Sequence, residues 1–253
     1  MTSVGTLALA IGAVAGMFGV VNTVILKPLP FNESERLVSI LGTAPGSDLP
    51  ENFDTGGEFY LHYKEQSRLL DGIFTFGERT STLRTENRVE RIRMAWPSNE
   101  IYSTLGVRPQ LGRLPVPEDG DDVVLISDQL WNSWFGRDPA VIGKTYFVSD
   151  TIRQIIGVMP AEFRFPSDET LLWVASPVQL SDIRPGNFGW PIVARMKDGV
   201  TREQLALELT NLSKALPERF GGPPNYARII QQHTAVVDPL LERMVGPAVR
   251  TSL

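Results

Sequence analysis

The chain has 253 residues, a net charge of −5, no cysteine, and a hydrophobic fraction of 42%. This balance supports a packed core and offers no basic surface suited to nucleic acid. The missing cysteines exclude a disulfide framework, a thiolate metal site and a cysteine nucleophile. The length suits one membrane segment followed by one large or two small domains.

The N-terminal 26 residues carry no ionisable side chain, and residues 4–26 form a nearly unbroken apolar run. At about 1.5 Å per residue, a helix of this length crosses a hydrocarbon core of about 30 Å. We therefore expect a transmembrane helix over residues 1–27. A cleaved signal peptide and a buried core helix are the alternatives. The run is longer than a signal's apolar region, and no Lys or Arg precedes it.

The orientation of this helix presents a conflict. Lys27 follows the helix, and the positive-inside tendency alone would place that end, and the domain after it, in the cytoplasm. A basic flank upstream of Met1 would remove the conflict. Glycines recur along the run and permit close approach of other helices, which suits a helix packed in a bundle. Pro28 and Pro30 then end it, because proline lacks a backbone donor and restricts the preceding residue.

The remaining chain alternates strand and helix patterns, which predicts a mixed α+β fold after the transmembrane helix. Turn residues, capping residues and apolar periodicity place the elements. In chain order we expect a strand at 36–41, a helix at 57–70, a hairpin at 81–96, a short helix ending at Gly106, a strand at 123–126, a helix from Ser127 to Gly136, a hairpin at 146–158, a strand at 190–196, a helix at 201–216, and a strand at 227–232.

A loose internal echo, strand–helix–strand, occurs near residues 37–84 and again near 192–232. The region between them is rich in short strands and reads as an insertion. We expect five segments: 1–27, transmembrane helix; 28–110, first half of a strand–helix–strand subdomain; 111–185, β-rich insertion; 186–240, second half; and 241–253, a connection to further membrane segments.

No combination of residues predicts catalysis, so we expect no enzyme, no catalytic, cofactor-binding or metal residues, and no cofactor. His62 and His233 lack metal-ligand companions and read as structural histidines. The glycines at 221–222 lack the Lys-Ser/Thr of a phosphate loop, and the acidic run at 118–122 lacks the ligand spacing of a calcium loop, which favours a solvated loop. Aromatic residues at 131–135 read as core.

Several stretches, in order along the chain, resemble the MacB-like periplasmic core domain of ABC transporter permeases with FtsX-like membrane regions. The most distinctive is WFGRDPAVIG at 134–143. The other stretches are 7–12, 18–30, 35–38, 106–113, 124–127, 156–160, 163–166 and 195–201. None of them is catalytic, so they indicate a family and no substrate.

The resemblance implies a porter-like subdomain of strand–helix–strand units and a β-rich inserted subdomain, held outside the bacterial inner membrane. It also implies a separate ABC ATPase subunit, further permease helices and possible dimerisation. A full permease continues into at least three more membrane helices, so this chain resembles the N-terminal part of one. The expected function is non-catalytic coupling of cytoplasmic ATP hydrolysis to periplasmic movement during export. The alternative is a membrane-tethered periplasmic binding module without transport activity.

Overall fold

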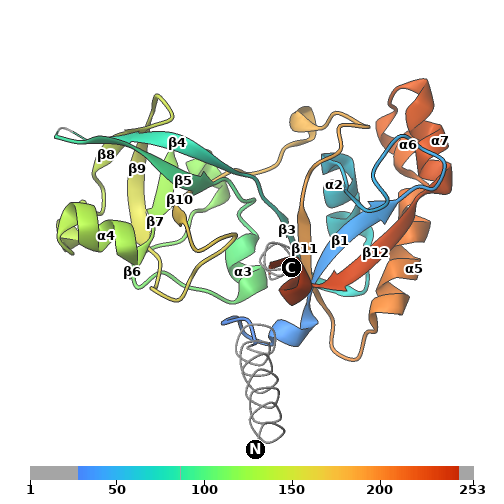
Figure 1. Ribbon diagram of the computed structural model, residues 1–253, viewed down its shortest axis with the longest axis horizontal. Helices are drawn as coiled ribbons and strands as arrows, with labels where there is room; N and C mark the ends of the chain where they lie inside the picture. Colours follow the sequence, from blue (N-terminus) through green and yellow to red (C-terminus); the bar gives the residue numbers. More distant parts are fainter. Residues whose placement is uncertain (1–27, 86, 245–253) are drawn as a thin grey trace, which may run out of the picture.

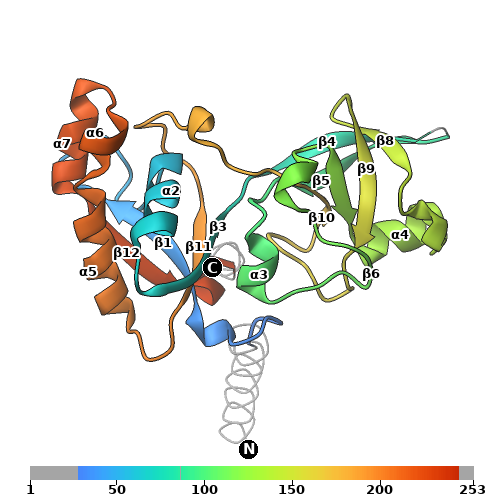
Figure 2. The same ribbon diagram turned by 180° about the vertical axis from the view of Figure 1, so that it is seen from behind.

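The computed structural model describes residues 28–85 and 87–244. These residues form two lobes side by side, each built on its own sheet (Figures 1 and 2). The expected transmembrane helix at 1–27 lies outside the described residues. Within the described ranges, no helix combines the length and the apolar character needed to cross a membrane.

The first lobe, here called the sheet lobe, has strand order β12-β1-β11-β3, and β2 also pairs with β1. The four main strands are antiparallel neighbours. The strands are β1 (Leu37–Thr43), β2 (Phe53–Asp54), β3 (Leu70–Thr75), β11 (Ile192–Met196) and β12 (Thr234–Pro239); the helices are α2 (Gly57–Gln66), α5 (Arg202–Ser213), α6 (Leu216–Phe220) and α7 (Pro224–Gln232).

The second lobe, here called the barrel lobe, contains β4 to β10 and the helix α4 (Asp128–Phe135). Its neighbours run β9-β7-β10-β5-β4-β8, and β8 pairs again with β9, which closes the sheet into a barrel. The closure is partial, because β8 pairs with β4 only at Leu83 and Arg84. The strands are β4 (Glu78–Arg84), β5 (Val89–Ala95), β6 (Leu111–Gly112), β7 (Val123–Ile126), β8 (Thr145–Val148), β9 (Thr151–Val158) and β10 (Thr170–Val174).

The two lobes share a hydrophobic core. Phe74 and Val193 from the sheet lobe and Leu125 and Trp173 from the barrel lobe belong to one buried cluster. The short helix α3 (Ile101–Leu105) adds to it and packs against β3 and β11. Short 3-10 helices lie at η1 (Ser34–Arg36), η2 (Pro117–Asp119), η3 (Pro139–Val141) and η4 (Leu180–Asp182). Each lobe also has its own core, so this third cluster acts as the joint between them.

The mixed α+β class is confirmed, and most strand predictions hold. The expected helix from Ser127 to Gly136 is α4: the Ser127 hydroxyl accepts from the Leu130 amide at 3.0 Å, and Gly136 ends the helix with φ +56°. The hairpin at 81–96 is present as β4 and β5. Alternation and capping residues were sufficient signals for these elements.

One predicted strand is wrong, because residues 227–232 lie in helix α7. Pro223 and Pro224 start this helix, and Tyr226 and Ile230, four residues apart, are its buried positions. The strand follows the helix as β12, where burial alternates at Ala235 and Val237. The apolar residues that predict a strand here lie on the buried face of an amphipathic helix.

Three other boundaries differ. Helix α2 ends at Gln66, and residue 70 already begins β3. Helix α5 ends at Ser213, and α6 begins at Leu216. The barrel sheet includes β4 and β5, although the sequence had suggested a β-rich insertion from residue 111. Cross-strand pairing with β8 and β10 places this hairpin in the barrel, and such long-range pairing leaves no local pattern.

Candidate functional site

The incoming segment, residues 28–36, lies on the core that joins the two lobes. Phe31 is buried there, and Leu29 packs against the same cluster. The Phe31 ring meets the rings of Phe163 and Phe165 edge-on, each at a centroid distance of 6.4 Å. The chain therefore enters the domain through a contact with the barrel lobe before it forms the first strand of the sheet lobe.

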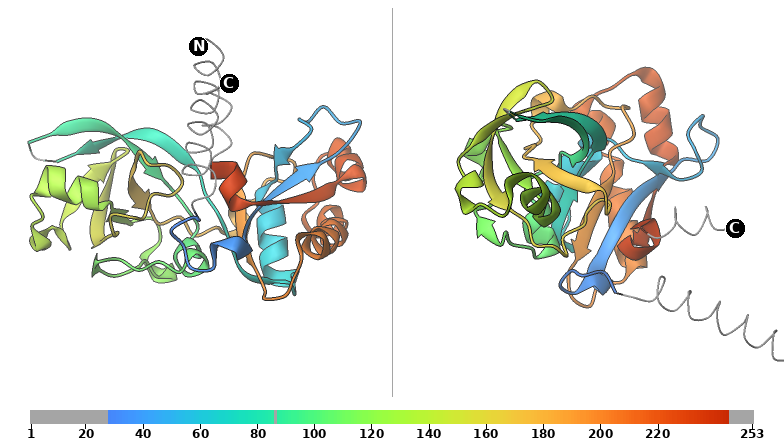
Figure 3. Two further views of the ribbon diagram at one scale, coloured as in Figure 1. Left: turned by 60° about the horizontal axis from the view of Figure 1, so that its bottom comes forward. Right: turned by 60° about the vertical axis from the view of Figure 1, so that its left-hand side comes forward.

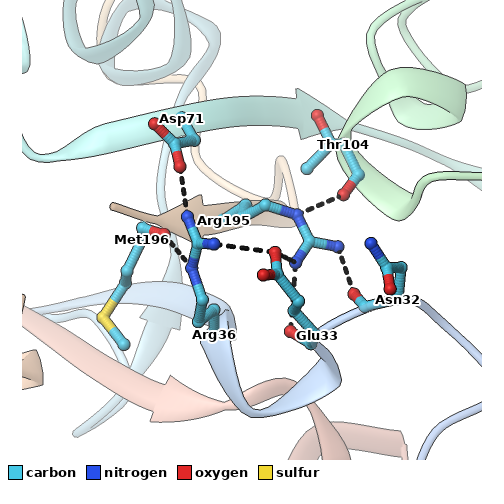
Figure 4. A network of polar contacts seen from close by, with 7 residues as sticks. All are labelled: Asn32, Glu33, Arg36, Asp71, Thr104, Arg195 and Met196. Atoms are coloured by element: carbon cyan, nitrogen blue, oxygen red, sulfur yellow. Dashed lines mark hydrogen bonds and ion pairs between the residues drawn. The ribbon is translucent and has the colours of Figure 1, made fainter. Parts of the chain in front are cut away.

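Arg195 fixes this segment to the sheet lobe (Figure 4). Its guanidinium donates to the Asn32 carbonyl at 2.6 Å, the Glu33 carbonyl at 3.0 Å and the Thr104 carbonyl at 2.9 Å. Arg195 itself lies in β11, whereas Thr104 is in the last turn of α3. One buried side chain thus connects the incoming segment, a sheet strand and the helix that packs at the joint. We call this set of contacts the arginine clamp.

Arg36 extends the clamp on its exposed side (Figure 4). Its guanidinium donates to the Met196 carbonyl at 2.8 Å, pairs with the Glu33 carboxylate at 2.7 Å and also pairs with Asp71 at the start of β3. Planar guanidinium groups with several fixed donors suit such multiple contacts. The carboxylate of Glu33 lies between the two arginines, because it is also 3.6 Å from Arg195.

Burial and the neighbouring Arg36 lower the pKa of Arg195, whereas Glu33, Glu35 and Asp71 oppose this shift. An arginine remains protonated at neutral pH even with such a shift. Hydrogen bonds to a charged group contribute about 1.5–3 kcal/mol each, so the clamp holds the segment strongly.

The outgoing segment, residues 239–244, lies on the same joint. Leu240 is buried in the shared core, and Met244 packs against it. Arg243 donates to both oxygens of Asp54, at 2.7 and 3.1 Å, and approaches the Ser39 hydroxyl at 3.3 Å. The incoming and outgoing segments therefore both attach at the centre of the molecule, between the lobes (Figures 1 and 3).

A groove of about 960 Å³ runs between these two segments and the barrel lobe. Residues of both segments line it, including Pro28, Pro30 and Leu240, together with Phe76 and Phe165 of the joint. A displacement of either segment would therefore act directly on the residues that hold the lobes together. Mechanically, the site is a junction of two connections and two lobes.

The two histidines lie in the sheet lobe, away from this junction. The Nδ1 atom of His233 lies 2.9 Å from the Ser213 hydroxyl, and its ring packs on Phe59 at 4.9 Å. Burial, together with Lys214, lowers the pKa of His233 to about 3. His62 lies 2.9 Å from Arg219, and burial is the main cause of its lowered pKa. Both histidines therefore contact neighbouring side chains within the sheet lobe.

The acidic run at 118–122 makes contacts to arginines. Asp119 binds Arg113 with both oxygens, at 2.6 and 2.7 Å, and Asp121 pairs with Arg153 at 3.2 Å. Among the described residues, no group of three or more His, Cys, Asp or Glu side chains is arranged to hold a metal. The aromatic residues of α4 are half-buried and pack against the barrel core, where Arg88 stacks on Trp134 at 4.2 Å.

Sequence reasoning missed the arginine clamp. Both Arg36 and Arg195 fall within the stretches that carry the family resemblance, yet no role followed from their positions. A usable signal was present: Arg195 is the single charged residue of the apolar strand Ile192–Met196. A charge inside a buried strand needs partners, and this requirement predicts a specific polar network.

Comparisons with known proteins agree with this architecture. The chain matches the family described as MacB-like periplasmic core domain over residues 1–212. A search of functionally curated proteins yields no match.

Three solved structures with the same fold can be compared with this chain. The periplasmic region of MacB from Actinobacillus actinomycetemcomitans gives a TM-score of 0.58 at 14% identity, covering 84% of this chain and 94% of that one. A domain of a putative permease from Porphyromonas gingivalis gives 0.62 at 17%, covering 83% and 92%. The extracellular domain of the noncanonic ABC-type transporter YknZ from Gram-positive bacteria gives 0.52 at 13%, covering 78% and 99%.

At these identities the solved structures show that the fold is shared. Membership of a family rests on the family match over residues 1–212. The two-lobed domain, with both connections on its central joint, belongs to the MacB-like periplasmic core domain family of ABC transporter permeases.

Proposed function

We propose that this domain couples movement of a membrane segment to movement of its two lobes outside the membrane, without chemistry of its own. The movement originates in a separate ABC ATPase subunit and reaches the domain through residues 1–27, which we propose form a transmembrane helix. The family supports the transporter setting, and the arginine clamp is the observation that supports the coupling role.

The clamp suits coupling because it joins parts that would otherwise move separately. A pull on residues 28–33 acts on β11 and on α3 through one guanidinium, since the carbonyls of Asn32 and Thr104 share the Arg195 side chain. Phe31 carries the same pull to the barrel lobe through Phe163 and Phe165. The incoming segment thus acts on both lobes at once.

We also propose that the sheet lobe is a porter-like unit interrupted by an inserted β-rich region, approximately residues 111–185 together with the β4–β5 hairpin. In this organisation residues 28–110 and 186–240 supply the two halves, and 241–253 lead back towards the membrane. Strand β1 belongs to the first half and strands β11 and β12 belong to the second. The pairing of β1 with both of them supports this organisation.

The test uses the assembled transporter that contains this chain, with ATP hydrolysis and export measured together. We expect Arg195→Met to lower export per ATP hydrolysed while ATP hydrolysis continues, because the incoming segment then moves without pulling on β11 and α3. The control is Arg137→Met, since the Arg137 guanidinium pairs with Asp128 at 2.6 Å and this residue lies just after α4 in the barrel lobe.

A second variant tests the stiffness of the connection. Replacing both Pro28 and Pro30 by glycine restores backbone freedom and should also reduce export per ATP. Unchanged coupling in both variants, with the domain still folded, would contradict the proposal. Stable capture of a peptide, lipoprotein or adaptor protein by residues 28–253 without any ATPase would instead favour a tethered binding module.

A further inference from the structure

A pocket of about 380 Å³ lies where the chain crosses between the two lobes. Three separate crossings line it: residues 75–77 between β3 and β4, residues 96–98 after β5, and the long strap at 176–190 between β10 and β11. The crossings themselves can be followed in Figures 1 and 2. The volume is within the range of about 300–1,000 Å³ found for small-molecule sites.

Three of the eleven residues that line this pocket are aromatic. Phe76, Trp96 and Trp190 each come from a different crossing. A Cβ atom on Gly77 would lie 2.3 Å from the Trp96 ring, and one on Gly57 would lie 3.0 Å from the Trp190 ring. Both indoles therefore lie directly against bare backbone, and this backing fixes their positions. Arg79, which is not among the residues that line the pocket, stacks on Trp96 at 4.9 Å.

Asp182 gives the pocket its charge. One of its oxygens accepts from the Gln179 amide at 2.9 Å, which orients the carboxylate, and the other makes no hydrogen bond within the described residues. No lysine or arginine is among the residues that line this pocket. Four other hollows in the described part of the chain are each lined by at least one arginine, so this combination of aromatic rings and a lone carboxylate is distinctive.

We propose that this pocket binds a small organic cation with an apolar or aromatic body. The three aromatic side chains supply apolar surface for the body of the ligand, and the Asp182 carboxylate attracts its positive charge at the strap. The ligand would contact all three crossings at once, so its binding would favour one arrangement of the lobes over others. This site is separate from the arginine clamp and does not depend on the coupling role.

Benzyltrimethylammonium is a suitable probe, and titration calorimetry with the full chain measures its binding. We expect one site per chain with a Kd of about 0.1–1 mM, as its eleven non-hydrogen atoms allow. The neutral benzyl methyl sulfone and the anionic benzylsulfonate are size-matched comparisons. Both should bind at least threefold more weakly, because neither carries a positive charge that the Asp182 carboxylate attracts.

Two variants locate the site. Val178→Phe fills the pocket and should abolish binding, whereas Asp182→Asn keeps an acceptor for the Gln179 amide and should weaken binding about three- to fivefold. Asp182 is exposed, so this second variant leaves the core intact. Trp134→Phe, in the hollow beside α4, is the control and should bind as the unaltered chain does.

Tryptophan fluorescence provides an independent readout, because two of the five tryptophans line the pocket. Quenching by the probe should be lost in the Val178→Phe variant and retained in Trp134→Phe. Equal binding of the three probes would overturn the proposal, as would binding that neither Val178→Phe nor Asp182→Asn changes.

Discussion

The two lobes bury different kinds of side chains. The barrel core is aliphatic, with residues such as Ile126, Leu130 and Leu172 fully buried, and Arg153 is its one charged residue among the buried side chains. The sheet lobe buries Glu58, His62, Arg195 and His233. In the barrel lobe Arg153 donates to the Val148 carbonyl at 2.6 Å, whereas the sheet lobe uses several buried polar groups to attach helices and connecting segments. We therefore expect the barrel lobe to contribute pH-independent stability and the sheet lobe to contribute pH-dependent stability.

The largest expected effect comes from the barrel. Ile126→Ala removes a fully buried side chain from β7 and should lower the free energy of unfolding by about 3 kcal/mol, by the same amount at pH 5 and pH 8. Denaturant unfolding measures it. Ile152→Ala, on the exposed outer face of β9, is the matched control and should change stability by no more than about 0.5 kcal/mol. A loss of stability that differed between pH 5 and pH 8 would contradict the expectation that the stability of the barrel lobe is independent of pH.

The next effect concerns His233. Its pKa is lowered to about 3, so the unfolded chain binds a proton at a pH where the folded chain does not. Stability should therefore fall as pH decreases below 6.5, by up to about 2 kcal/mol at pH 5. His233→Asn should flatten this slope in denaturant unfolding between pH 7 and pH 5. An unchanged slope would show that His233 does not cause this dependence of stability on pH.

Glu58 should act in the opposite direction. Burial raises the pKa of this fully buried carboxyl despite its hydrogen bond from the Gly186 amide at 3.1 Å. The folded chain therefore holds the Glu58 proton more tightly than the unfolded chain does. This stabilises the folded state fully below pH 4.5, and the stabilisation is lost as pH rises through the raised pKa. Relative to the unaltered chain, Glu58→Gln should thus become more stable as pH rises, which denaturant unfolding between pH 5 and pH 8 measures. A constant difference across this range would show that Glu58 does not titrate there.

The smallest expected effect is at the outgoing segment. Arg243→Ala removes a half-buried pair with Asp54 and should cost about 1 kcal/mol or less. Thermal unfolding in low and high salt checks it, because screening should reduce the difference. A loss insensitive to salt would mean that the packing of the Arg243 stem, rather than its charge, holds this segment.

The comparison also shows where sequence reasoning succeeds. Ser127 and Gly136 carry local capping signals, and the capping box of Thr201 and Gln204 marked the start of α5, so these helices were predicted correctly. The barrel was not predictable as a barrel, because closure depends on the pairing of β8 with both β4 and β9. The amphipathic run at 227–232 was misread, since short apolar patterns do not separate helix from strand.

The candidate site was harder to predict for a physical reason. The clamp consists of one side chain that reaches carbonyls 91 and 163 positions away in the chain, and a backbone carbonyl has no sequence signature. The proline connection next to it was predictable, because proline restricts the chain wherever it occurs. Arg195 could be recognised only as a charge that needed partners.

The coupling claim can be tested most directly by replacing the clamp with a covalent bond. The chain has no cysteine, and a Cβ at Gly106 would lie 3.3 Å from the Asn32 Cβ, near the separation in a disulfide; the left-handed φ of +70° at Gly106 adds a cost of about 1–2 kcal/mol for any side chain there. In the assembled transporter carrying Arg195→Met, the pair Asn32→Cys and Gly106→Cys should restore export per ATP when oxidised and lose it again when reduced. Export per ATP that stays low in the oxidised protein, or that Arg195→Met never lowers, would contradict the account.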